Sequence, residues 1–102
     1  MGKAELKEIK IKLPGDVIKE ISNKEIIAML LDKALSKAEY YHSSSKEMEE
    51  KYGMDFISFK KKIEKTRKED FTEWDDFILW EGYTLGYEEW NKKYKELKNC
   101  RE

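Results

Sequence analysis

The stretch FTEWDDFILWEGYTLGYEEWNKKYKELK, residues 71–98, has the strongest periodic pattern in the sequence. Its apolar residues recur at steps of three and four, which is the spacing of one face of an α-helix. The main stripe consists of Phe77, Trp80, Tyr83, Tyr87, Trp90, Tyr94 and Leu97. A second flank carries Trp74, Ile78, Gly82, Leu85 and Gly86. The sequence therefore predicts a long C-terminal helix that is apolar on two sides.

The aromatic stripe of this helix has two interpretations. Apolar side chains at coiled-coil spacing need another surface to bury them, and that surface can be the rest of this chain, with the stripe as its core. Tyrosine and tryptophan are also enriched among the anchors of protein–protein interfaces, and a chain of 102 residues has little material to cover both flanks. Under the second interpretation the candidate partner-binding residues are Trp74, Trp80, Tyr83, Tyr87 and Trp90.

Near the other end of the sequence, LKEIKIKL at residues 6–13 has the alternating pattern of a β-strand. Ile9, Ile11 and Leu13 alternate with charged residues, and Pro14–Gly15 ends the segment. A single short strand is not stable alone, and no later segment offers it a partner, so we expect it to pair with the strand of a second copy. Ile9, Ile11 and Leu13 are thus candidate dimerisation residues. In the alternative interpretation the strand only lines the edge of a helical domain.

Two lysines of this strand give the sequence a hypothetical DNA-binding surface. An antiparallel ribbon of two such strands would place Lys10 and Lys12 on one exposed face. A two-stranded ribbon fits the major groove of DNA, so Lys10 and Lys12 are candidate DNA-binding residues. The overall charge argues against non-specific binding, because 21 Lys and Arg against 22 Asp and Glu leave a net charge of −1.

Between these two segments the sequence predicts further helices. A short helix covers about residues 16–21, and a longer helix covers about residues 24–42, with Asn23 or Ser22 as its cap. The serine run at residues 43–45 is expected to end the longer helix and to begin a short one that reaches Gly53. Another helix is expected to follow before the long C-terminal one.

The predicted fold class is mainly α, with one short N-terminal β-strand, paired across a dimer, followed by four to five helices. We expect one compact domain made of two units. Residues 1–43 would form a strand–helix–helix unit for dimerisation and DNA binding, and residues 44–102 a helical, aromatic-rich unit for partner binding.

No pattern in the sequence indicates catalysis, a metal site or a cofactor. His42 is the only histidine and Cys100 the only cysteine. Asp75 and Asp76 are adjacent, so on a helix their side chains point about 100° apart and do not converge on one site. Zinc-ligand spacing and a glycine-rich phosphate loop are both absent from the sequence. We therefore expect no enzyme activity, no metal and no cofactor.

Composition and hydropathy favour a cytoplasmic protein. The sequence has no run of about 18 apolar residues that would span a membrane, and its first residues lack the apolar core of a signal peptide. Charged residues make up 42% of the chain and glutamine is absent, a balance typical of thermophile proteins.

The order of the predicted elements resembles a known class of small prokaryotic proteins. The strand, proline, short helix and longer helix of residues 6–41 resemble the dimerising half of ribbon-helix-helix antitoxins. Further matching segments, Glu39–Tyr41, Lys51–Phe56, Trp74–Phe77, Trp80–Tyr83 and Trp90, resemble small archaeal proteins classed as antitoxin-like. The resemblance implies a homodimer whose N-terminal half binds its own operator, with Lys10 and Lys12 facing the DNA. It also implies that the last helix contacts a toxin, often a ribonuclease.

The sequence and the resemblance together predict a non-catalytic binding protein, the antitoxin of a type II toxin–antitoxin pair, which neutralises a toxin and represses its own operon. One alternative is a small DNA-binding transcriptional regulator that has no toxin. Another is a free-standing helical domain with a structural or adaptor role.

Overall fold

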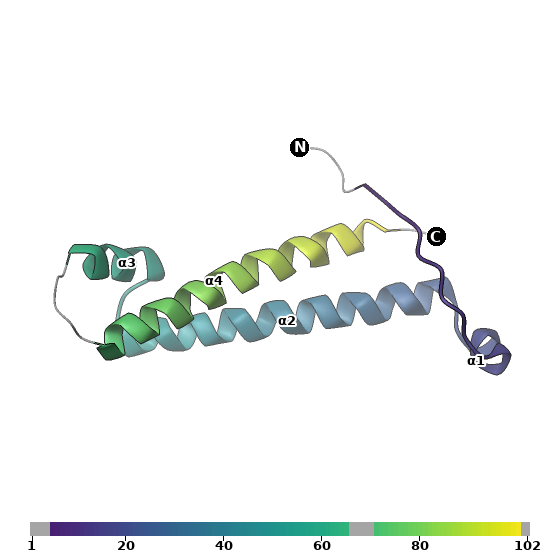
Figure 1. Ribbon diagram of the computed structural model, residues 1–102, viewed down its shortest axis with the longest axis horizontal. Coiled ribbons are helices and arrows are strands. Elements are labelled where there is room, and N and C mark those ends of the chain that lie inside the picture. The colour runs from purple at the N-terminus through teal and green to yellow at the C-terminus, as the bar shows by residue number, and fades with distance from the viewer. Residues whose placement is uncertain (1–4, 66–70, 101–102) are drawn as a thin grey trace.

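The computed structural model describes residues 5–65 and 71–100, and four helices lie within these ranges. They are α1 (Gly15–Glu20), α2 (Asn23–Tyr52), α3 (Phe56–Lys65) and α4 (Phe71–Lys98). The two long helices, α2 and α4, lie side by side and run antiparallel, as Figure 1 shows. The radius of gyration is 19.3 Å, against about 13 Å for a compact chain of this length, so the molecule is an elongated helical hairpin.

The contact between α2 and α4 follows the same alternating steps of three and four in both helices. In α2 the side chains turned toward α4 are Ile27, Leu31, Ala34, Ala38, Tyr41, Ser45, Met48 and Tyr52. In α4 they are Asp76, Trp80, Tyr83, Tyr87, Trp90, Tyr94 and Leu97. We call this contact the hairpin seam. Steps that average 3.5 residues keep one face of each helix on its neighbour over many turns, which is coiled-coil packing.

Small residues let the two long helices approach closely near the middle of the seam. Ala34 and Ala38 of α2 are fully buried, although each carries only a methyl group. In α4, Gly86 lies directly beneath the ring of Tyr41: a Cβ at Gly86 would lie 2.9 Å from three ring carbons. This glycine is therefore required by the packing of the seam.

A small apolar core closes the end of the hairpin where α3 packs. Phe59 and Ile63 of α3 are buried against Trp80 of α4. Residues from all three helices and the α2–α3 turn surround them: Met48, Tyr52, Met54, Phe56 and Phe77. The chain turns sharply from α2 into α3 because Gly53 adopts the left-handed conformation at φ 65°.

The predicted N-terminal β-strand is wrong. Residues 6–13 are extended but form no strand, and the structure assigns no strand elsewhere in residues 5–65 and 71–100. The backbone groups of a strand must pair with a neighbouring strand, and the alternating pattern of apolar residues does not provide one. The predicted pairing of two such strands across a dimer is therefore wrong as well. The mainly α class agrees with the structure.

The expected break at Ser43–Ser45 is also wrong, because α2 continues without interruption from Asn23 to Tyr52. Ser45 faces α4, and its hydroxyl accepts a hydrogen bond of 2.8 Å from the indole Nε1–H of Trp80. The predicted boundary between residues 43 and 44 falls inside this helix. The predicted cap at Ser22 is confirmed, since its hydroxyl accepts from the Glu25 amide and the Glu25 carboxylate accepts from the Ser22 amide.

Candidate functional site

The best-defined polar cluster joins the end of α2 to the start of α4. Asp76 is buried, and its Oδ2 accepts hydrogen bonds from Lys51 Nζ at 2.6 Å and from the Tyr52 hydroxyl. These two bonds, the one from Lys51 first, lower the pKa of Asp76 below its usual value. The buried carboxylate thus has both of these partners on α2. The cluster therefore fixes the register of the hairpin.

Sequence reasoning missed this cluster, because it considered Asp76 only as a possible pair with its neighbour Asp75. The available signal was the position of Asp76 four residues before Trp80, in register with the aromatic stripe. A carboxylate at a seam position needs partners on the facing helix. Lys51 and Tyr52 supply them.

The five candidate partner-binding residues of the C-terminal helix are placed in different environments. Trp80 is fully buried and belongs to the core of this chain. Tyr83 and Tyr87 are half-buried in the seam, where their rings contact Tyr40 and His42 of α2. Trp90 is half-buried, with the Lys93 ammonium 4.3 Å from its ring centre. Trp74 is half-exposed, so it is the member of the set that an external partner can reach most easily.

The N-terminal arm, which we define as residues 5–20, is exposed along its whole length. Every residue of the arm is exposed, and α1 contributes no buried side chain. Its exposed large apolar residues are Leu6, Ile9, Ile11, Leu13, Val17 and Ile18. Burial against another surface would remove these side chains from water, which favours association. The arm therefore includes all three candidate dimerisation residues on an uncovered surface.

Lys10 and Lys12 are also exposed on the arm. Their assignment to DNA depended on a two-stranded ribbon, which the residues seen in the structure do not form. The arm carries four basic and four acidic residues, so it has no excess of cations to attract phosphates.

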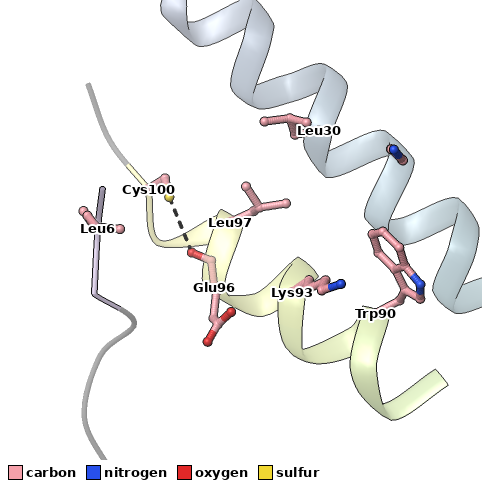
Figure 2. A pocket seen from close by; sticks show the side chains of 8 residues that line it. Leu6, Leu30, Trp90, Lys93, Glu96, Leu97 and Cys100 are labelled. Carbon is pink, nitrogen blue, oxygen red and sulfur yellow. Dashed lines mark hydrogen bonds between the residues drawn. The ribbon is translucent and has the colours of Figure 1, made fainter. Parts of the chain in front are cut away.

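An apolar cavity of about 360 Å³ lies where the arm passes the open end of the hairpin. Figure 2 shows Leu6 of the arm on one side, Leu97 of α4 near the centre, and Leu30 of α2 and Trp90 of α4 farther from Leu6. Cys100 also lines the cavity and its thiol donates to the Glu96 carbonyl at 3.7 Å. Leu6 is the residue through which the arm borders this cavity.

A second exposed apolar surface lies on α4, on the side away from the seam. We call it the outer face of α4 and define it by Phe71, Trp74, Ile78, Gly82 and Leu85. The same helix therefore presents apolar side chains both to the seam and to solvent, as the two flanks in its sequence predict.

Within residues 5–65 and 71–100, no three His, Cys, Asp or Glu side chains gather in a way that could hold a metal ion. No helix in the same ranges has the length and apolar character needed to cross a membrane.

Comparison of the chain with protein-family models, with curated proteins and with solved structures finds no match.

Proposed function

We propose that this chain is a non-catalytic binding protein whose N-terminal arm holds a protein partner. The observation that carries the proposal is the arm itself, in which six large apolar side chains are exposed and none is buried. Monomeric proteins seldom leave so many neighbouring apolar side chains in water without a use for them. The helical hairpin has its own core and acts as the scaffold that carries the arm.

The apolar residues of the arm suit a protein surface in both size and charge. Their exposed fractions range from 41% at Leu13 to 77% at Ile9. Their burial would contribute on the order of 5–10 kcal/mol before the entropic cost of association is subtracted. Since basic and acidic residues balance within the arm, apolar contact rather than attraction to phosphates would provide the binding energy.

The partner class that we propose is a small toxin, as the resemblance to antitoxins implies. An antitoxin needs no chemistry of its own, because it acts by covering the surface that the toxin uses. The proposal places both proteins in the cytoplasm, where the RNA substrates of a ribonuclease toxin are found. Operator binding by Lys10 and Lys12 is not part of the proposal, since the ribbon that it requires is not formed.

The test co-expresses the chain with the product of the reading frame beside its own gene. We expect a stoichiometric complex in which a ribonuclease activity of the partner is suppressed. Replacing Ile9 and Ile11 together by Asp should lower the affinity by at least 100-fold, because charges would then enter the apolar contact. The matched control is Ile57→Asp, which changes an isoleucine of α3 that is 65% exposed and lies outside the arm.

Two results would contradict the proposal. The first is a neighbouring product that is neither bound nor inhibited at micromolar concentrations. The second is a complex that the arm variant forms as tightly as the unmodified chain. In the first case a free-standing structural domain becomes the better interpretation. In the second case the partner binds elsewhere on the hairpin.

A further inference from the structure

The apolar cavity at the open end of the hairpin has walls from three separate parts of the chain. Its volume of about 360 Å³ lies at the lower end of the range that small-molecule sites occupy in proteins. Its apolar side chains come from the arm, from α2 and from α4: Leu6, Leu30, Trp90 and Leu97 (Figure 2). A small molecule in this cavity would therefore contact both long helices and the arm.

Three charged side chains also line the cavity, and two of them are neutralised by neighbours on α4. Lys93 Nζ lies 3.0 Å from the Glu89 carboxylate, and the Glu96 carboxylate lies 3.4 Å from Lys92 Nζ. The third charged side chain is Lys33 of α2. Among residues 5–65 and 71–100, no Asp or Glu carboxylate forms an ion pair with Lys33. The cavity thus combines apolar walls with a positive charge that the described part of the chain does not balance.

We propose that this cavity binds a small aliphatic carboxylate, whose hydrocarbon chain lies against Leu30, Trp90 and Leu97 and whose carboxylate pairs with Lys33. Removal of the hydrocarbon chain from water favours binding. Lys33 is exposed, and a lysine can lay its stem along apolar surface while its ammonium stays in water. The carboxylate can therefore remain partly hydrated at the mouth of the cavity, which avoids the cost of burying a charge completely.

The charges of the cavity select an anion over other amphiphiles of the same size. A cationic head group would be repelled by Lys33, and the carboxylate that lines the cavity, Glu96, is already paired with Lys92. A neutral alcohol would make the same apolar contacts but no ion pair. An ion pair that is exposed to water changes an affinity by up to about five-fold, so the preference for the anion is of this size.

This site is separate from the partner-binding surface proposed for the arm. The cavity uses only Leu6 of the six exposed apolar residues of the arm. A ligand in the cavity would therefore leave Ile9 and Ile11, the residues changed in the test of partner binding, uncovered.

Octanoate is the probe, and two-dimensional ¹H–¹⁵N NMR spectroscopy of the full chain locates and measures its binding. We expect a Kd on the order of 100 μM, with the largest shifts at Leu30, Leu97 and the indole of Trp90. The indole of Trp74, on the outer face of α4, is the internal control for simple adhesion to exposed apolar surface. 1-Octanol and octylammonium should each bind about five-fold more weakly or less.

A matched pair of variants tests the role of Lys33. Lys33→Met removes the charge and keeps a long side chain, so it should raise the Kd for octanoate about five-fold and leave the Kd for 1-octanol unchanged. The control is Lys37→Met, which changes an exposed lysine one turn further along α2 that does not line the cavity. It should change neither affinity. Both positions are exposed, so the helical circular dichroism spectrum should stay the same.

Cys100 provides a second measurement at the same site. It is the only cysteine in the sequence and it lines the cavity, so its alkylation by iodoacetamide reports on access to the cavity. At about 1 mM octanoate, alkylation should be at least five times slower. An unchanged alkylation rate would overturn the proposal, as would equal affinities for octanoate and octylammonium or equal shift midpoints for the indoles of Trp74 and Trp90. None of these results bears on partner binding by the arm, which is tested with a different ligand and different variants.

Discussion

Replacing Gly82 or Gly86 by alanine makes the same chemical change at two positions one turn apart in α4, and we expect opposite effects on stability. At Gly82 a new Cβ would have no heavy atom within 4 Å from the rest of the described chain, apart from the adjacent residues and the backbone of α4 itself. Alanine is the better helix former by about 1 kcal/mol, so Gly82→Ala should raise the free energy of unfolding by about that amount. For a domain of this size the melting temperature would rise by about 4–8 °C.

At Gly86 the same gain in helix propensity is outweighed by a steric conflict. The new Cβ would lie 2.9 Å from three carbons of the Tyr41 ring, well inside normal contact distance. Overpacking of this kind costs about 1–3 kcal/mol, because the ring or the helix must move. Gly86→Ala should therefore leave stability unchanged or lower it by up to about 2 kcal/mol. The two variants should differ by about 1–3 kcal/mol.

The assay is urea unfolding followed by circular dichroism, with both variants at the same low micromolar concentration so that self-association does not contribute. The variant pair Tyr41→Ala and Tyr41→Ala/Gly86→Ala separates the two effects at Gly86. Without the ring, alanine at position 86 should stabilise the helix as it does at position 82. If Gly86→Ala is as stabilising as Gly82→Ala in the unmodified background, the close approach of α2 and α4 at Tyr41 is refuted.

Three further predictions concern the core and its polar contacts. Trp80→Ala should lower the free energy of unfolding by about 3–5 kcal/mol, against about 1 kcal/mol for the half-exposed Trp74→Ala, as measured by urea unfolding. Ser45→Ala should destabilise by about 1–2 kcal/mol despite the better helix propensity of alanine, because the buried Trp80 Nε1–H loses its acceptor. Because the pKa of Asp76 is lowered in the folded chain, its contribution to stability is present above pH about 4 and is lost as the pH falls through the folded pKa, so Asp76→Asn should unfold with a weaker acid dependence.

Each of these three predictions has a result that would contradict it. Similar losses for Trp80→Ala and Trp74→Ala would mean that the core is not centred on Trp80. A stabilised Ser45→Ala chain would show that the hydrogen bond to Trp80 is not formed. Parallel acid-unfolding curves for Asp76→Asn and the unmodified chain would show that the bonds from Lys51 and Tyr52 do not favour the carboxylate over the acid.

Features that depend on short-range patterns in the sequence were predicted correctly. The continuity of α2, which depends on a contact with a distant residue, was not. The range 71–98 and the cap at Ser22 follow from spacing and from side chain to backbone bonding within one turn. The serine run at residues 43–45 misled the prediction because serine often ends helices when its hydroxyl competes for backbone groups. In the folded chain the Ser45 hydroxyl is occupied by Trp80, a residue 35 positions away.

The candidate binding surfaces also divide into features that the sequence shows and features that only the structure shows. The two apolar flanks of α4 and the apolar residues of the arm can be listed from the sequence alone. The sequence alone does not show which flank of α4 faces α2, because both flanks have helical spacing. The structure assigns Trp80 to the core and Trp74 to the outer face, although they are only six residues apart.

The sequence by itself determined the helical class, the length and periodicity of α4, and the absence of a recognisable catalytic or metal motif, because these properties depend on residue type and short-range spacing. Only the tertiary structure decided that α2 continues through its serines and that Asp76 is bonded to Lys51 and Tyr52. It also decided that the N-terminal arm finds no strand to pair with among the residues that the structure describes. Each of these depends on which groups from distant parts of the chain are available to bury a side chain or to accept a hydrogen bond. These groups come together only in the folded hairpin.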